Sequence, residues 1–122
     1  MSWPDWLRPR RESVPPECAD LVEAWRRLAP PEQNQPLSAL RWVVVDTESG
    51  GIDPHRDALL SIGGCVVRDG EMRLNEVFER VLRQSAPSAS ENILIHGIAG
   101  QAQLDGDSPQ QALAEFLAFF CG

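Results

Sequence analysis

The sequence predicts an α/β fold made of an N-terminal helix, a three-stranded antiparallel meander and a C-terminal helix. Apolar residues recur at helical spacing near both ends of the chain, and between these regions the pattern changes to that of β-strands. The tight-turn sequence Arg68-Asp69-Gly70 indicates a hairpin between two of the strands. A chain of 122 residues, 43% of them hydrophobic and 24% charged, provides one hydrophobic core and not two.

Residues 1–40 are predicted to form a proline-rich extension with one amphipathic helix between Pro16 and Ala29. The apolar positions of this helix follow the helical repeat and are Cys18, Leu21, Val22, Trp25 and Leu28. The proline-rich segment 30–36 is typical of a linker. The start of the chain carries an aromatic and basic group that is either a docking peptide or a segment that folds back or stays disordered: Trp3, Trp6, Leu7, Arg8, Arg10 and Arg11.

The first strand is predicted at 41–47. Its run Trp42-Val43-Val44-Val45 has apolar side chains on both faces, which is typical of a central strand covered on both sides. A turn-rich stretch follows, and the second strand is predicted at 58–67. Gly63 and Gly64 inside the second strand indicate a bulge or a close approach of another group to the backbone.

The third strand is predicted at 71–82, with an apolar face formed by the even positions Met72, Leu74 and Phe78. A C-terminal helix is predicted to begin after Ser108, a candidate N-cap, with Pro109 in the first helical position and Gln111 completing a capping box. Its apolar face is expected to pack on the sheet and consists of Leu113, Phe116, Leu117 and Phe120.

The chain is acidic, with a net charge of −7, and its basic residues are arginines without a single lysine. Six acidic residues and six arginines cancel before residue 45, so the whole excess lies in 45–122. Domains that hold nucleic acid through phosphate contacts are normally basic. A metal ion or a partner protein would therefore have to offset the repulsion if this chain approached a polyanion.

Three widely spaced cysteines, Cys18, Cys65 and Cys121, argue against a disulfide framework and a zinc knuckle, and they favour reduced thiols in the cytoplasm. The apolar runs are only a few residues long, whereas a membrane span needs about 20. The N-terminus also lacks the apolar region of a secretory signal. We therefore expect a cytoplasmic protein that has no membrane partner.

Asp46 and Glu48 stand two residues apart at the end of the first predicted strand, so they point to the same face of the sheet. At roughly 6–7 Å and an effective dielectric constant near 20, two carboxylates repel each other by about 2–3 kcal/mol. Protonation of one group or a hard cation between them would relieve this repulsion. The glycine-rich turn that follows favours the cation, because a ligand can approach its backbone closely. The alternative is that both acids simply lead into a solvated turn.

Asp46 and Glu48 lie within a longer sequence motif, and further motifs follow along the chain. VVVDTESGGIDP at 43–54 is followed by SIG at 61–63, and further along His96-Gly97-Ile98 precedes the capped helix. In this order, the segments resemble the DnaQ-like (DEDD) 3′–5′ exonuclease family, a group that includes the proofreading epsilon subunit of bacterial DNA polymerase III. The resemblance covers about residues 41–122 and implies the RNase H-like fold of that family.

The resemblance implies a metal-dependent hydrolase that acts on the single-stranded 3′ end of DNA or RNA, in proofreading or processing. Asp46 and Glu48 would be the catalytic residues and would coordinate Mg²⁺ or Mn²⁺, as the first two of the family's four acids. Two positions differ from the family, which often has threonines where this chain has serine and glycine. The residues implied to contact the 3′-terminal nucleotide are Thr47, Ser49, Gly50 and Gly51.

The family's later motifs, which carry two more acids and the general base, have no counterpart in this sequence. We therefore expect residues 41–122 to be the N-terminal part of an exonuclease domain, a truncated RNase H-like fold with weak or no activity of its own. His96 does not match the family's base and is interpreted as a turn residue.

Without the family's fourth strand, the first strand is expected to have an open apolar edge. A second copy, a polymerase or another protein chain would complete the sheet there. Two alternatives stay open: a non-catalytic interaction module derived from an exonuclease domain, and a fragment of a longer coding sequence.

Overall fold

The computed structural model describes residues 13–30, 32–53 and 55–121, so the aromatic and basic group of residues 3–11 lies outside the described range. Two 3₁₀ helices, four α-helices and three strands follow one another in the described chain. Their order is η2 (Pro16–Cys18), α1 (Ala19–Arg26), η3 (Leu37–Ala39), β1 (Trp42–Ser49), β2 (Leu59–Arg68), β3 (Glu71–Val81), α2 (Ser90–His96), α3 (Gly100–Leu104) and α4 (Pro109–Cys121).

The three strands form an antiparallel sheet in the order β1-β2-β3, which confirms the predicted meander. Asp69 and Gly70 make the two-residue turn between β2 and β3, with φ angles of 55° and 78°. Hairpin turns that match the twist of the strands need positive φ at both central positions. Aspartate and glycine tolerate this conformation better than most residues, so the Asp-Gly pair suits the turn.

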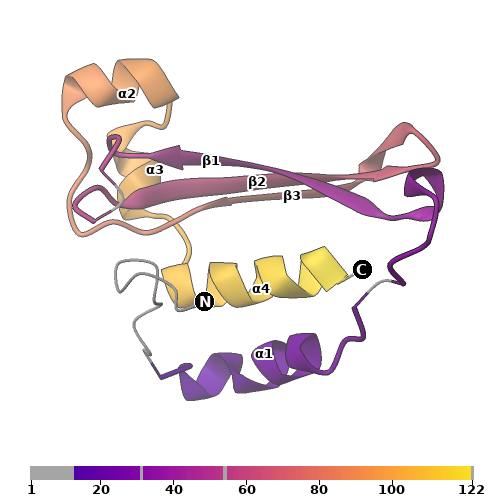
Figure 1. Ribbon diagram of the computed structural model, residues 1–122. Coiled ribbons are helices and arrows are strands. Elements are labelled where there is room, and N and C mark those ends of the chain that lie inside the picture. The colour runs from indigo at the N-terminus through magenta and orange to yellow at the C-terminus, as the bar shows by residue number, and fades with distance from the viewer. Residues whose placement is uncertain (1–12, 31, 54, 122) are drawn as a thin grey trace.

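Helices cover one face of the sheet in two layers, with α4 against the strands and α1 on the far side of α4 (Figure 1). α2 lies on the opposite side, near one end of the strands. The predicted N-terminal helix is present after a 3₁₀ turn, and Cys18 at their junction is 1% exposed. The core between the sheet and α4 contains Ile62, Phe78, Leu82 and Ala112, with Leu59, Phe116 and Phe119 packed against it.

Aromatic rings of α4 rest directly on the backbone of β2 at Gly64. A Cβ atom at this position would lie 3.0 Å from Phe119 Cε1 and 3.5 Å from Phe116 Cε2. The ring of Phe78 meets that of Phe116 edge to face, with 5.4 Å between the centroids. The close backbone approach expected from the two glycines therefore occurs at Gly64.

The apolar face of α4 differs from the predicted one. Phe116 and Phe119 pack on the sheet, whereas Leu113 and Phe120 are 44% and 50% exposed. The helix lies between the sheet and α1, and it carries apolar residues on more than one side. Helical spacing therefore does not single out the face that meets the sheet.

The start of α4 also differs in one detail from the prediction. The helix begins at Pro109, and its first hydrogen bond runs from the N–H of Ala112 to the carbonyl oxygen of Ser108. The expected capping box is absent, because Gln111 Nε2 donates to Glu115 Oε1 at 3.0 Å and Gln111 Oε1 accepts from Cys18 Sγ at 3.7 Å. Contacts with Cys18 of η2 and with Glu115 of α4 itself thus take the glutamine away from the cap.

The even positions of the third strand do not form a buried face. Met72 and Leu74 are 59% and 79% exposed. Cys65 pairs with Val77, but the next residue of β2, Val66, pairs with Arg73. Residues 74–76 therefore bulge out of the pairing, and the alternation expected from the sequence is broken at this point.

β1 is an edge strand of the described sheet, because it pairs with β2 alone. Trp42, Val44 and Val45 are 46%, 55% and 43% exposed. The prediction of a strand covered on both faces is thus wrong for the residues that the structure describes. The expected apolar edge is present, with unpaired backbone groups along its outer side.

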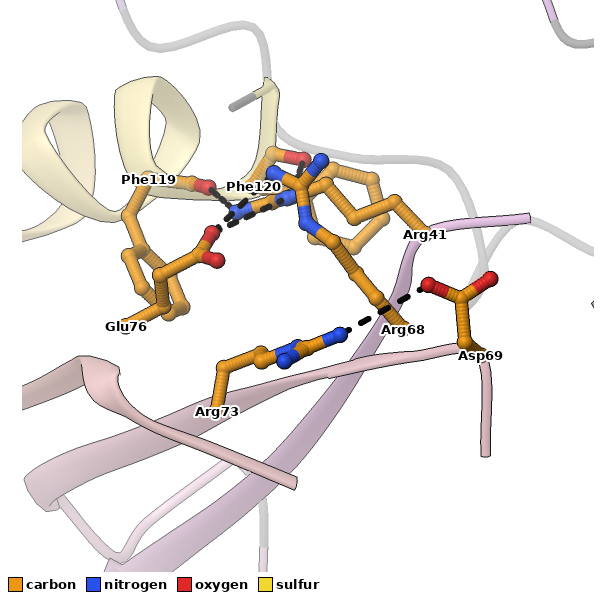
Figure 2. A network of polar contacts seen from close by, with 7 residues as sticks. All are labelled: Arg41, Arg68, Asp69, Arg73, Glu76, Phe119 and Phe120. Atoms are coloured by element: carbon orange, nitrogen blue, oxygen red, sulfur yellow. Dashed lines mark hydrogen bonds and ion pairs between the residues drawn. The ribbon is translucent and has the colours of Figure 1, made fainter. Parts of the chain in front are cut away.

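Arg41 ties the start of β1 to the end of α4 (Figure 2). Its Nη1 and Nη2 atoms donate hydrogen bonds of 2.8 Å to the carbonyl oxygens of Phe120 and Phe119. The guanidinium carbon lies 5.6 Å from the centroid of the Phe119 ring. The last carbonyl groups of a helix lack partners within the helix, so Arg41 supplies charged donors where they are needed.

The bulge of β3 takes part in the same network. Glu76, inside the bulge, lies 3.9 Å from Arg41 Nε and accepts a hydrogen bond of 3.1 Å from Arg68 (Figure 2). A separate ion pair, between Arg73 and Asp69 at 3.6 Å, spans the adjoining hairpin. The bulge therefore places Glu76 next to Arg41, the arginine that donates to the last carbonyl groups of α4.

Among the described helices, none is both long enough and apolar enough to cross a membrane.

Glu115 links α4 to β3. It accepts a hydrogen bond from Gln111, and its Oε2 atom lies 3.1 Å from Arg80 Nη2. The hydrogen bond from Gln111 has the largest effect on the pKa of Glu115 and lowers it. Burial opposes this effect, and the hydrogen bond and the charge of Arg80 add to it, so the pKa is below its ordinary value of 4.5. The carboxylate form is therefore favoured in the folded chain.

We predict that Glu115→Gln lowers the thermal midpoint more at about pH 7 than at about pH 3. Because folding lowers the pKa of Glu115, its contribution is complete above the ordinary value and is lost as the pH falls through the lower, folded value. Melting curves followed by circular dichroism measure this difference. Glu91→Gln, at a position with no ion pair among the described residues, is the control. If Glu115→Gln lowered the thermal midpoint equally at both pH values, the Glu115 carboxylate would not have this stabilising role.

We also predict that Gly64→Ala destabilises the chain by about 1–3 kcal/mol, because the new methyl group would push against Phe119 and Phe116. Gly63→Ala is the matched control in the same strand, since its Cβ would meet no atom nearer than 3.9 Å. Urea unfolding compares the free energies of both variants. Equal stability of the two variants would show that α4 does not rest on Gly64.

Candidate functional site

Asp46 and Glu48 lie in the second half of β1 and face away from α4. Cross-strand partners share a face of the sheet, and Val45 pairs with Gly64, on which the rings of α4 rest. Successive side chains of a strand point to opposite faces. Both carboxylates are therefore on the open face of the sheet, the face that α4 does not cover.

A hollow of about 530 Å³ opens beside the two carboxylates. Asp46 pairs with Gly63, which pairs in turn with Glu79, so a glycine separates two acidic residues across the sheet. A Cβ atom at Gly63 would meet no atom nearer than the carbonyl oxygen of Asp46, at 3.9 Å. The missing side chain leaves room at the floor of the hollow. Its acidic lining residues are Asp46, Glu48 and Glu79.

No arginine is paired with these three acids within the described part of the chain. Arg80, which follows Glu79, turns to the α4 side, where its guanidinium lies 4.9 Å from the Phe78 ring centroid and within 3.6 Å of Asp107. The hollow is thus strongly negative, and carboxylate oxygens are the ligands that Mg²⁺ and Mn²⁺ prefer. However, residues 13–30, 32–53 and 55–121 contain no group of three His, Cys, Asp or Glu side chains that could hold a metal ion.

Glu79 is a lining residue that sequence analysis missed. The hairpin turn sets Val67 opposite Met72, and continuing that register would place Glu76 opposite Gly63. The bulge at 74–76 moves Glu79 into that position instead. The neighbouring residue Phe78 could have indicated the orientation of Glu79. Phe78 is buried and faces α4, and successive side chains of a strand point to opposite faces, so Glu79 points to the open face.

The turn after β1 is held by hydrogen bonds from two directions. The N–H of Gly50 donates to the carbonyl oxygen of Ala58 at 2.9 Å, and Asn92 Nδ2 donates to the carbonyl oxygen of Gly50 at 2.8 Å. Ser49 Oγ donates to the carbonyl oxygen of Gly51 at 2.5 Å. The turn is thus preorganised, and the serine hydroxyl is already engaged within it.

Gly51 is in contact with the side chain of Asp57. A Cβ atom on Gly51 would collide with the Asp57 carboxyl group, whose Oδ2 atom accepts the N–H of Asp53 at 2.8 Å. Glycine therefore allows the carboxylate to close the loop. This loop borders a second hollow of about 430 Å³, next to Ser49 and Gly51.

The predicted site residues are consequently divided between two hollows. Asp46, Thr47 and Glu48 line the larger one, and Ser49 and Gly51 line the smaller one. Thr47 pairs with Ile62, which directs its side chain toward the α4 face. Gly50 contributes through its backbone, which is bonded to Ala58, just before β2, and to Asn92 of α2.

His96 ends α2 and lines the larger hollow. Its Nδ1 atom accepts the N–H of Ile98 at 3.0 Å, across Gly97 with its φ of 74°. The residue therefore shapes the turn after the helix, as its interpretation from the sequence states. Its Nε2 atom is buried and has no hydrogen-bond partner in the described residues. In the neutral ring this nitrogen carries the proton, because Nδ1 acts as an acceptor.

A comparison with protein-family models finds a match over the region of the site. The model of the RNase_T family, described as "Exonuclease", matches residues 43–122. The matched region begins inside β1, includes both carboxylates and the turn after them, and continues through α4. No curated protein matches the chain.

We predict that Gly51→Ala weakens the loop by about 1 kcal/mol, because the methyl group would displace Asp57 and break its hydrogen bond to Asp53. Hydrogen exchange of the Asp53 amide should become faster. Gly50→Ala is the matched control, since its Cβ would lie 3.8 Å from the nearest atom. Faster exchange in both variants, or in neither, would show that the Gly51–Asp57 contact does not hold the loop.

Proposed function

Since the chain belongs to the RNase_T exonuclease family, we propose that its larger hollow is a site for metal-dependent hydrolysis at the 3′ end of a nucleic acid. The observation that carries this proposal is the placement of Asp46 and Glu48, side by side on the open face and without an arginine partner in the described residues. Two neighbouring carboxylates that no internal cation neutralises favour the binding of an external one.

Asp46 and Glu48 would hold Mg²⁺ or Mn²⁺ in this site. Such an ion supplies charge stabilisation and activates water in phosphodiester hydrolysis. The two side chains themselves do two things: they offer oxygen ligands, and their charge makes the hollow selective for cations. Because the chain carries a net charge of −7, a phosphate group is repelled from this face until a cation is in place.

The turn formed by Ser49, Gly50 and Gly51 is proposed to receive the 3′-terminal nucleotide. It follows directly on the two carboxylates and borders the smaller hollow. Its hydrogen bonds to Ala58 and to Asn92 of α2 fix its shape before a ligand arrives, which lowers the entropic cost of binding. Thr47 would contribute through its backbone, because its side chain is on the other face.

We propose further that this chain by itself binds one cation weakly and has little or no nuclease activity. Two metal ions close together need several shared carboxylates to offset their mutual repulsion, and the described residues bring only two family acids to the hollow. The outer edge of β1 is where a second copy, a polymerase subunit or another protein chain would add a strand and complete the site.

The exposed edge of β1 also favours a second candidate function. Trp42, Val44 and Val45 are between 43% and 55% exposed along a strand that pairs on one side alone. Such a strand binds an extended segment of a partner through main-chain hydrogen bonds. In this case the chain would be a non-catalytic interaction module, and its carboxylates would have no role in binding a metal ion.

Titration with Mn²⁺, followed by calorimetry, separates the two functions. We predict one weak Mn²⁺ site whose affinity falls by about tenfold or more in Asp46→Asn and in Glu48→Ala, because each variant removes one negatively charged carboxylate. Glu71→Gln, at the far end of β3, is the control for the loss of one negative charge. Equal Mn²⁺ binding by all four proteins would contradict the metal site and support the interaction module.

Digestion of a 3′-labelled single strand in the presence of Mn²⁺ tests the proposed weakness of the activity. Trace or absent degradation is the expected result. Rapid degradation that Asp46→Asn abolishes would show that the described residues suffice for catalysis, and our proposal of an incomplete site would be wrong.

A further inference from the structure

The last residue of α2, His96, lines the larger hollow, but the helix is weakly anchored. It has seven residues, none of them buried, and its large side chains Leu94 and Ile95 are 86% and 84% exposed. A helix of this length has almost no stability of its own, and no buried apolar face holds this one. Specific polar contacts must therefore decide where it lies.

One such contact joins α2 to the turn after β1. Asn92 Nδ2 donates a hydrogen bond of 2.8 Å to the carbonyl oxygen of Gly50, which is 42 residues away in the sequence, and the bond is partly buried. The N–H of the same glycine donates to the carbonyl oxygen of Ala58, the residue before β2. The peptide groups of Gly50 are thus bonded on both sides, once to the residue that leads into β2 and once to α2.

The position of α2 matters because its last residue lines the hollow. His96 and Ile98 face the space next to Asp46 and Glu48, and a single turn of helix separates Asn92 from His96. A displacement of α2 away from Gly50 would move this wall and widen the hollow. Asn92 touches neither hollow itself, so any effect on a ligand would pass through α2 and the turn.

We propose that Asn92 is a positioning residue that sets the separation between α2 and the Gly50 turn, and thereby the fit of a 3′-terminal nucleotide beside the two carboxylates. This inference rests on the proposed function and adds to it a residue that contacts neither the metal ion nor the reacting atoms. It requires that loss of the Asn92 hydrogen bond weakens binding of a strand end while cation binding at Asp46 and Glu48 is retained.

Two variants test this role. Asn92→Asp keeps the size of the side chain but places a carboxylate against the carbonyl oxygen of Gly50, and Asn92→Ala removes the side chain. Asn75→Asp, in the bulge of β3, is the matched control for the change of charge. Each protein is titrated with Mn²⁺ alone, and then, in saturating Mn²⁺, with a short single-stranded oligothymidylate that carries a fluorophore at its 5′ end.

We expect about tenfold weaker oligothymidylate binding by both Asn92 variants, with the Mn²⁺ affinity and the far-ultraviolet circular dichroism unchanged. Asn75→Asp should bind both ligands like the unmodified chain. Oligothymidylate binding that is unchanged in the Asn92 variants would overturn the positioning role. A parallel loss of Mn²⁺ affinity would also overturn it, because it would show that the residue maintains the fold and not the separation of the two walls.

Asp46→Asn distinguishes failure of this inference from failure of the proposed function. If the unmodified chain binds oligothymidylate in a manner that depends on Mn²⁺ and on Asp46, but not on Asn92, the proposed function stands and the positioning role is wrong. If binding is absent, or is indifferent to Mn²⁺ and Asp46, the proposed function fails and the positioning role fails with it.

Discussion

Val45 faces the helix layer, and because successive side chains of a strand point to opposite faces, Asp46 and Glu48 have to face away from it. This alternation along β1 decides where chemistry is possible in the molecule. The α4 face is filled by aromatic rings, and burial of an unpaired carboxylate among them would cost on the order of several kcal/mol. The open face leaves both acids in a hollow where a cation can reach them. Packing on one face and charge on the other are therefore two consequences of one backbone geometry.

Two adjacent glycines in β2 serve these two faces. Gly64 lets the rings of α4 rest on the strand, and Gly63 leaves room at the floor of the hollow between Asp46 and Glu79. Arg41 then joins the layers at the other end of β1, by bonding to the last carbonyl groups of α4. The site is consequently built on a strand whose start is tied to α4 and whose partner strand supports both the core and the hollow.

The periodicity of the sequence sufficed for the strands, the hairpin and the two main helices, because each depends on local spacing and on residues such as Asp69 and Gly70. It also sufficed to put Asp46 and Glu48 on one face. The bulge of β3 was not predictable in this way, since Glu76 inside it contacts Arg41 from a distant part of the chain as well as Arg68 across the hairpin. Missing the bulge meant missing Glu79 in the hollow. The prediction of which residues of α4 pack on the sheet was partly wrong for a related reason. α1 packs against α4, so this helix is covered on two sides.

The central claim is that the carboxylates of β1, and not the acids elsewhere on this acidic chain, hold a divalent cation. Paramagnetic broadening of amide signals by substoichiometric Mn²⁺ tests it most directly in the ¹⁵N-labelled chain. Our account predicts that the signals of Asp46, Thr47, Glu48 and Gly63 broaden first, while those of α1 keep their intensity. Broadening that begins at Asp53 and Asp57, or that spreads evenly over all exposed acids, would contradict it.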